Sequence, residues 1–221
     1  MQSFKQFINE EERVNNSQRT QVATTSGTYR KTGKFLKDKL HPQSRVLSVG
    51  AGLDQTTEGL HQGLGENHDH TVHDFEPYPE NRKNPPTFTH EKDIPKDHYH
   101  ASVSHNVLNV VEPHEREGVM HNIFHATKSG GHAVIGTRSW KGDIEKNKNF
   151  YPGDEPKSMW VRKKKKGGGE ETSYQKGFDD NELKDYAEDY AKRHGHTVTV
   201  KKLPGMAKST IHIHIHKKAG E

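Results

Sequence analysis

Several features are scarce in this chain, and each absence narrows the choice of function. There is no cysteine among the 221 residues, which excludes disulfide bonds and thiol catalysis. No apolar run approaches the ~18 residues of a membrane span, and the opening Met1–Lys5 lacks the apolar core of a secretory signal. We therefore expect a cytoplasmic protein that does not enter a membrane.

Apolar residues are also few. They make up 28% of the chain, and the mean hydropathy is −1.14, but they are gathered in short strand-like runs. A chain of this length suits one domain with a buried sheet and helices on both faces. The net charge of +4 is mild, so it permits a nucleic-acid partner without requiring one.

The most informative segment is Arg45–Leu60. Val46, Leu47 and Val49 predict a buried parallel strand, and the Gly50-Ala51-Gly52 turn after it lets the backbone approach a ligand closely. The helix that follows would direct its amide end at that ligand. A dinucleotide site needs a third glycine or an alanine where this chain has Gln55, which disfavours NAD and FAD.

A second strand, within Thr71–Pro79, ends in carboxylates. In an open α/β sheet a carboxylate at this place holds a ribose hydroxyl pair. Glu76 is our choice for that role and Asp74 is the alternate, although a solvated loop carboxylate beside Pro77 is also consistent with the pattern.

At this point the chain resembles the class I S-adenosylmethionine-dependent methyltransferases, whose first strand ends in Gly-x-Gly and whose second ends in an acidic residue. His98–Pro113 is similar to the fourth strand of that family and the segment after it, and Lys128–Thr137 is similar to its turn into the fifth strand. The Asn106–Pro113 and Tyr174–Phe178 segments also resemble a subgroup of phage and bacterial methyltransferase-like proteins, some of them associated with DNA modification.

The resemblance implies a Rossmann-like three-layer α/β sandwich, with a seven-stranded, mostly parallel sheet and a C-terminal antiparallel hairpin. It also implies that the cofactor is S-adenosylmethionine. Gly50, Ala51 and Gly52 would hold its methionine part, Glu76 its ribose, and Asp93 with Ile94 its adenine. Ser104, His105 and Asn106 would form the floor beneath the sulfonium and the methyl acceptor, with Ser104 touching both.

Three departures from the family pattern bear on activity. Ser48 replaces the acidic residue that usually opens the first motif, and Asp54 replaces a frequent third glycine. Ser104–Val107 stands where a nucleic-acid amino-methyltransferase would carry an Asp/Asn-Pro-Pro-Tyr-like motif. The methyl acceptor is open, and the basic loop with the subgroup resemblance slightly favours nucleic acid over a small molecule or a protein. A non-catalytic nucleic-acid-binding protein with a degenerate methyltransferase fold is the alternative, and an enzyme that binds another nucleotide in the same crevice is a third possibility.

The order of elements supports an alternating α/β chain. We predict helices over 27–40, 55–64, 113–128 and 179–193, and strands at 45–49, 70–75, 87–89, 99–104 and 132–138, followed by a terminal hairpin within 197–216. Residues 1–34 would form an N-terminal arm with a helix, and 35–217 the methyltransferase domain. Within it, 139–175 reads as a long basic loop.

Two further segments leave their roles open. Arg162, Lys163, Lys164, Lys165 and Lys166 could meet the phosphates of a nucleic acid, but the Gly167–Glu171 run beside them is equally typical of a solvated loop. Ile211–His216 alternates isoleucine with histidine, which places three imidazoles on one face of a strand. We expect a polar face there and no metal site, because no carboxylate or cysteine lies nearby in sequence.

Overall fold

The computed structural model describes residues 25–52, 55–65, 70–77, 84–148, 150–164, 170–206 and 209–219. Residues 1–24 of the N-terminal arm expected over 1–34 lie outside these ranges. None of the helices within them is long and apolar enough to cross a membrane.

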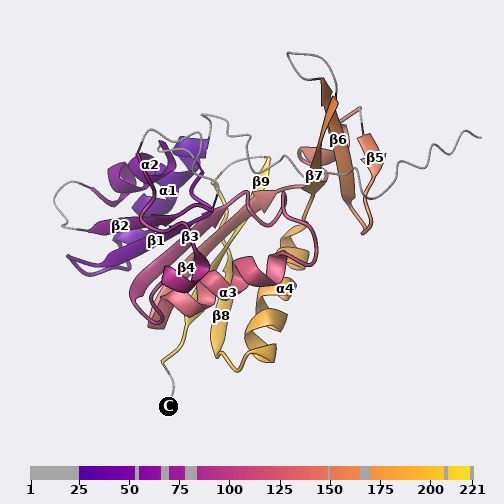
Figure 1. Ribbon diagram of the computed structural model, residues 1–221. Coiled ribbons are helices and arrows are strands. Elements are labelled where there is room, and N and C mark those ends of the chain that lie inside the picture. The colour runs from indigo at the N-terminus through magenta and orange to yellow at the C-terminus, as the bar shows by residue number, and fades with distance from the viewer. Residues whose placement is uncertain are drawn as a thin grey trace, which may run out of the picture.

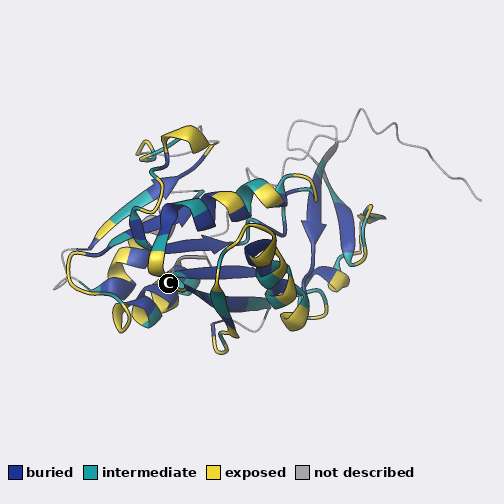
Figure 2. Cartoon of the chain, turned by 90° about the horizontal axis from the view of Figure 1, so that it is seen from below, coloured by how far each residue is buried: buried dark blue, intermediate teal, exposed yellow. Residues whose placement is uncertain are grey.

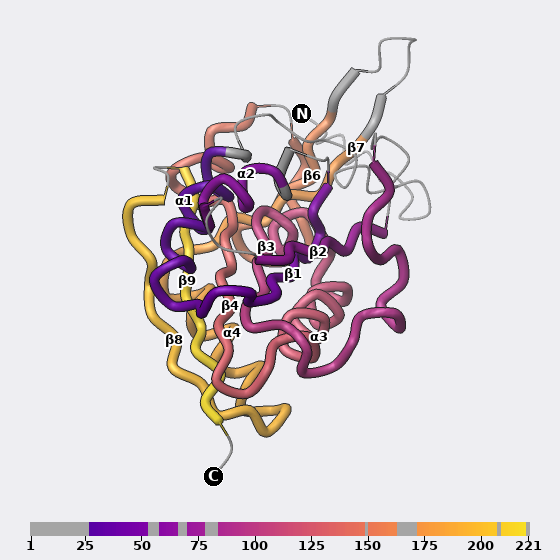
Figure 3. Tube along the Cα trace, turned by 90° about the vertical axis from the view of Figure 1, so that its left-hand side faces the viewer, coloured from indigo at the N-terminus to yellow at the C-terminus, as the bar shows by residue number. Residues whose placement is uncertain are grey.

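A six-stranded sheet forms the centre of the molecule, in the order β2-β1-β3-β4-β9-β8 (Figures 1 and 3). The first four of these strands run parallel, and β9 is antiparallel to both β4 and β8. The strands are β1 (Arg45–Val49), β2 (Thr71–Phe75), β3 (Tyr99–His105), β4 (Thr127–Arg138), β8 (Val198–Lys202) and β9 (Thr210–Lys217). The mostly parallel sheet with a C-terminal antiparallel hairpin is confirmed.

The strand count differs from the expected seven. The segment predicted as a third strand, 87–89, forms only an isolated parallel bridge between Phe75 and Phe88. Pro85 and Pro86 directly precede it, and proline has no N–H for a ladder. The Asp74 side chain instead accepts hydrogen bonds from the Thr87 amide and hydroxyl.

Helices cover both faces of the sheet and complete three layers. On one face lie α1 (Thr25–Lys37) and α2 (Gln55–Leu64), and on the other lie α3 (Arg116–Ala126) and α4 (Asp180–Arg193). The boundary drawn at residue 34 falls inside α1, whose Tyr29 and Leu36 are buried in the core. α1 is thus an integral layer of the domain.

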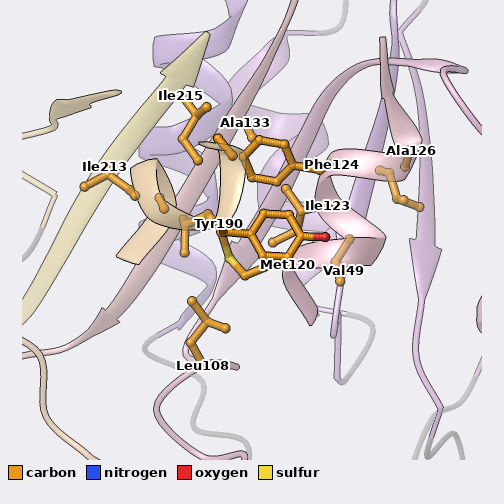
Figure 4. Close-up of a cluster of buried hydrophobic side chains, with 14 of the residues drawn as sticks. Val49, Leu108, Met120, Ile123, Phe124, Ala126, Ala133, Tyr190, Ile213 and Ile215 are labelled. Carbon is orange, nitrogen blue, oxygen red and sulfur yellow. The ribbon is translucent and has the colours of Figure 1, made fainter. Parts of the chain in front are cut away.

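Strand alternation separates the interior into two apolar cores. The larger one joins the sheet to α3 and α4, and Figure 4 shows Met120, Ile123 and Phe124 of α3 meeting Tyr190 of α4 and Ile213 of β9. The smaller one joins the opposite face to α1 and α2. Figure 2 shows the buried strands between helices whose outer faces are exposed.

The segment 139–175, predicted as a long loop, contains regular structure. It holds a short 3-10 helix, η5 (Ile144–Lys146), and the strands of a second, antiparallel sheet. These are β5 (Phe150–Pro152), β6 (Ser158–Lys164) and β7 (Glu170–Lys176). The buried Met159, Trp160 and Tyr174 form its packed interior, and their apolar signal is spread too thinly through a charged sequence to predict strands.

Candidate active site

The turn after β1 lies at the carboxyl edge of the parallel strands, where open α/β sheets place their ligands. Gly50 and Gly52 adopt φ angles of +66° and +60°, which glycine adopts without steric cost. The amides of Gly50 and Ala51 both donate to the Phe75 carbonyl, at 2.9 and 3.1 Å. A Cβ on Gly50 would lie 2.5 Å from Val107 Cγ2, so glycine is required by both conformation and space.

Glu76 stands at the end of β2, beside this turn. It is buried, and its Oε2 accepts a hydrogen bond from the Gly52 amide at 2.6 Å. Asp74, the alternate, is also buried, but its Oδ1 accepts from the Thr87 amide at 2.8 Å and hydroxyl at 3.1 Å. Glu76 therefore lies against the glycine turn, whereas Asp74 holds the segment that replaces the third strand.

Asp93 and Ile94 end a short 3-10 helix, η4 (Glu91–Asp93). Asp93 is exposed, whereas Ile94 is buried in the larger core. Packing in the core therefore fixes the side chain of Ile94 but not that of Asp93.

Ser104 and His105 end β3 and point to opposite faces of the sheet. Ser104 Oγ is buried on the face of the larger core and has no hydrogen-bond partner among the described residues. His105 lies on the α1 face, where its Nε2 is 2.8 Å from Thr32 Oγ1 and its ring meets the edge of Tyr29. Asn106 follows with φ +60° and donates its amide to the Gly136 carbonyl.

Burial governs the protonation of this region. It lowers the pKa of His105 well below the ordinary value, with His212 adding to the effect, and it raises the pKa of Tyr29 to about 12. The buried His105 is consequently neutral near pH 7 and is held beneath the crevice by Thr32. Tyr29 and Thr32 were not singled out from the sequence as site residues, because helical spacing marked Tyr29 only as a core position.

The second sheet contacts the segment that follows β3, next to the carboxyl edge of the main sheet. The Lys176 amide donates to the Asn109 carbonyl at 2.7 Å, so β7 packs against the segment that follows β3. The Asn109 side chain is fully buried, and its amide has no hydrogen-bond partner among the described residues. No sequence signal distinguishes Asn109 from the neighbouring polar residues, because its position depends on β7.

An ionic cluster fixes that sheet to α3. Arg116 Nε donates to the Leu108 carbonyl at 3.0 Å, and its Nη1 donates to Glu155 Oε2 at 2.9 Å. Tyr174 also donates to Glu155, and burial, with Glu155 beside it, raises the tyrosine pKa to about 12. The cluster joins the segment after β3, helix α3 and the second sheet at one point.

The basic segment predicted over 162–166 includes the end of β6 in this second sheet. Arg162 sits over the Tyr151 ring at 3.7 Å from the guanidinium carbon to the centroid. The β6–β7 register places Lys163 opposite Glu171 and Lys164 opposite Glu170, while Lys165 and Lys166 lie outside the described residues. Each described lysine position in the run thus faces an acidic position across the strands.

The alternation of isoleucine and histidine in β9 is confirmed, but the histidine face is not the polar outer face that was expected, because it packs against α1 and His212 is buried. Ile213 and Ile215 pack in the larger core, and the histidines lie on the α1 face, where His105 meets His212 and Phe35 meets His214. Among the described residues, no group of three or more histidines, cysteines or carboxylates is arranged to hold a metal ion.

The strand order 2-1-3-4-9-8, the reversed β9 and the glycine turn beside a buried carboxylate together decide the fold. It is the fold of the class I S-adenosylmethionine-dependent methyltransferases. Solved structures with the methyltransferase fold align along nearly the whole chain, whereas no protein-family model and no curated protein matches the sequence.

Three of those structures carry the comparison. An S-adenosylmethionine-dependent methyltransferase from Clostridium acetobutylicum is 11% identical, with a TM-score of 0.57 over 90% of this chain and 93% of its own. The 1,6-didemethyltoxoflavin-N1-methyltransferase of Burkholderia thailandensis is 12% identical, with a TM-score of 0.55 over 88% and 80%. The CcbJ methyltransferase of Streptomyces caelestis is 12% identical, with a TM-score of 0.55 over 90% and 99%.

Proposed function

We propose that this protein is an S-adenosylmethionine-dependent methyltransferase that acts on a small-molecule acceptor. The observation that carries the proposal is the contact between the Gly52 amide and the buried Glu76 carboxylate, which unites the glycine turn of β1 and the end of β2 at one edge. A glycine turn, whose backbone has no side chains in the way, next to a carboxylate at this edge fits a ligand made of a nucleoside and a methionine tail.

Each part of the site has a task in this proposal. Gly50, Ala51 and Gly52 bring the backbone against the methionine part, and Glu76 binds the ribose hydroxyls. Asp93 would offer a hydrogen-bond acceptor for the adenine, and Ile94, which is buried in the larger core, would hold this segment in place. When bound, the cofactor supplies a methyl group on a sulfonium that is already activated for transfer.

The remaining contribution of the protein is alignment of the acceptor. Asn106 lies at the end of β3, where an acceptor would meet the methyl group, whereas Ser104 Oγ is buried beneath it on the face of the larger core. His105 is buried against Thr32, so we assign it to holding this strand end in place and not to removing a proton. An acceptor that needs a base would therefore have to lose its proton to another group or to water.

The choice of a small molecule is supported by the second sheet. Its strand β7 is bonded to the segment after β3 through the Lys176 amide and the Asn109 carbonyl, next to the edge, which favours a small acceptor. Among the proteins with the same fold, the Burkholderia enzyme has 1,6-didemethyltoxoflavin and S-adenosylhomocysteine bound.

Calorimetric titration with S-adenosylmethionine and S-adenosylhomocysteine tests the cofactor site. We expect micromolar affinity that Glu76→Gln weakens about tenfold to a hundredfold, because hydrogen bonds to a charged group are lost. Glu58→Gln, an exposed position on α2, is the matched control and should bind normally. Asp74→Asn tests the alternate ribose ligand and should also retain affinity.

The class of acceptor is tested by incubating the protein with cofactor labelled in its methyl group, together with a metabolite extract or with DNA and RNA. Label that enters a metabolite and is lost in Glu76→Gln is the expected result. Label in nucleic acid would overturn the choice of acceptor alone. Failure of the folded protein to bind millimolar cofactor would overturn the enzyme itself and favour the non-catalytic alternative.

A further inference from the structure

A groove of about 420 Å³ lies on the α1 face of the sheet, between the end of α1 and the hairpin of β8 and β9. Its histidine side is formed by His132 of β4 with His214 and His216 of β9, and its other walls include cationic and apolar side chains. The residues lining it are Phe35, Lys39, His132, Thr199, Lys201, Lys202, Leu203, His214 and His216.

This groove is separate from the candidate active site. The β3–β4–β9 register places His132 and His216 opposite each other near the beginning of β4, whereas Gly136 pairs with His105 at the carboxyl edge. Four residues of strand separate His132 from Gly136, about 13 Å, whereas His214 pairs with Val134, two residues and about 7 Å from Gly136. None of the residues assigned to cofactor or acceptor lines the groove. A ligand in the groove would therefore meet none of the residues that we assign to cofactor or acceptor.

The imidazoles form a connected floor. His214 Nε2 and His132 Nδ1 are 3.1 Å apart, and the His132 ring stacks on His216 with centroids 4.9 Å apart. The His132–His214 contact uses the N–H of one ring and the acceptor nitrogen of the other, so while both rings are neutral one of the two remaining nitrogens carries a hydrogen and the other a lone pair. The floor has donors and acceptors without a metal ion.

The charged side chains that line the groove beside the imidazoles are all lysines. Lys39, which follows α1, and Lys201 of β8 are exposed. No carboxylate in the described part of the chain comes within ion-pair distance of either lysine, while Lys202 lies 3.6 Å from Asp180. Burial, followed by cationic neighbours that include Lys39, lowers the pKa of both His132 and His214 to about 4.

We propose that this groove is a second binding site, which takes a small phosphate ester. Lys39 and Lys201 would neutralise the phosphate, the imidazoles would donate hydrogen bonds to its oxygens, and Phe35 with Leu203 would contact the organic part. The volume suits a small molecule. This site is independent of the proposed methyl transfer.

Phenyl phosphate is a suitable probe, because it lacks the nucleoside and the amino acid that the crevice would recognise. We expect calorimetry to show binding that weakens about tenfold or more in the double variant Lys39→Glu with Lys201→Glu, since attraction becomes repulsion. The control, Lys148→Glu with Lys192→Glu, has the same net charge and changes exposed lysines outside the groove. All four positions are exposed, so folding is preserved.

Three results would overturn the proposal. They are absence of binding at millimolar phenyl phosphate by the folded protein, an equal loss in the control variant, and binding of a single-stranded oligonucleotide without binding of phenyl phosphate. Measuring the S-adenosylmethionine affinity of the same variants distinguishes a failure of this proposal from a failure of the proposed methyl transfer. This affinity should be unchanged in Lys39→Glu with Lys201→Glu, whichever way the phosphate result falls.

The histidine floor predicts how the affinity depends on pH. A bound anion raises the pKa of His132 and His214 above the values in the empty groove, so binding takes up protons and tightens as pH falls. The other charged or titratable lining groups are Lys39, Lys201, Lys202 and His216.

Inorganic sulfate is the probe for this dependence, because its charge stays constant over the range. Its affinity should rise as pH falls from about 6.5 towards the empty-groove pKa of about 4, and the imidazole signals of His132 and His214 should shift in nuclear magnetic resonance spectra. His132→Gln with His214→Gln should reduce the pH dependence, with His216 still lining the groove, and retain binding through the lysines. An affinity that is independent of pH in the unaltered protein would overturn the assignment of these imidazoles as ligands.

Discussion

Two glycines share an unusual backbone conformation but differ in their surroundings. Gly50 has φ +66°, and an added Cβ would press against Val107. Gly130 has φ +77°, and an added Cβ would meet nothing within 4 Å. The first glycine is needed for conformation and for close approach, and the second for conformation alone.

This difference predicts the outcome of a matched pair of substitutions. Gly130→Ala should lower the free energy of unfolding by about 1–2 kcal/mol, the cost of a left-handed alanine. Gly50→Ala should lose more than that, because the 2.5 Å contact with Val107 Cγ2 must also be relieved. Urea denaturation measures both losses, and calorimetry should show weakened cofactor binding only in Gly50→Ala. Equal effects on stability would contradict the close approach.

At the scale of elements, α1 and α2 cross at a pair of glycines. A Cβ on Gly33 would lie 2.6 Å from the Leu60 carbonyl oxygen and 2.8 Å from Gly63 Cα, and a Cβ on Gly63 would lie 2.2 Å from the Arg30 carbonyl oxygen. These are backbone atoms, which cannot move aside as a side-chain end can. The two helices therefore pack at backbone contact over the sheet.

Gly33→Ala should consequently cost about 1–3 kcal/mol of stability, the range for overpacking a filled interior. Gly27→Ala, in the same helix, adds a Cβ with nothing within 4 Å. It should be neutral or stabilising by up to about 1 kcal/mol, because alanine favours helix over glycine. Thermal or urea unfolding of the pair gives the comparison, and a stabilising Gly33→Ala would show that the helices are not in contact here.

The second sheet depends on the cluster of Arg116, Glu155 and Tyr174 for its attachment. Arg116→Met should lower the free energy of unfolding by about 2–4 kcal/mol, because a partly buried carboxylate and the Leu108 carbonyl lose their donor. Hydrogen exchange should quicken in β5–β7 before the main sheet. Arg193→Met, which removes exposed ion pairs to Glu117 and Asp189, should have a much smaller effect. Uniform loss of protection would mean that the two sheets unfold together.

The whole molecule is sensitive to acid because several histidines are buried as neutral rings. His212 is 5% exposed, and burial, followed by Lys31, lowers its pKa to about 4. The unfolded chain therefore binds a proton that the folded chain does not, between pH about 6.5 and about 4. Stability from this group is fully present above that window and is lost as pH falls through it.

We expect His212 alone to cost about 2 kcal/mol of stability between pH about 6.5 and about 5, with His105 acting in the same direction. Urea denaturation at the two values measures the loss. His212→Gln should show a smaller fall with pH than the unaltered protein, even if its stability at neutral pH is lower. His114→Gln, at an exposed position, serves as the control and should keep the full dependence. An unchanged slope in His212→Gln would contradict this account.

The sequence by itself determined the order of helices and strands in the main sheet, the glycine turn and the carboxylate at the end of β2. Helical and strand periodicity, turn residues and caps act over a few positions, so they can be read locally. The α/β class and the C-terminal hairpin followed from their order. The predicted roles of all the site residues stay predictions: Gly50, Ala51, Gly52, Glu76, Asp93, Ile94, Ser104, His105 and Asn106.

Only the tertiary structure decided which surfaces these residues share. It placed Ser104 and His105 on opposite faces, gathered His132, His214 and His216 into one groove, and brought Asn109 against β7. It also reduced the third strand to a bridge and folded the segment 139–175 into a sheet. Each of these outcomes depends on contacts between residues far apart in the chain, and local propensity contains no information about which distant partner will be buried against a given side chain.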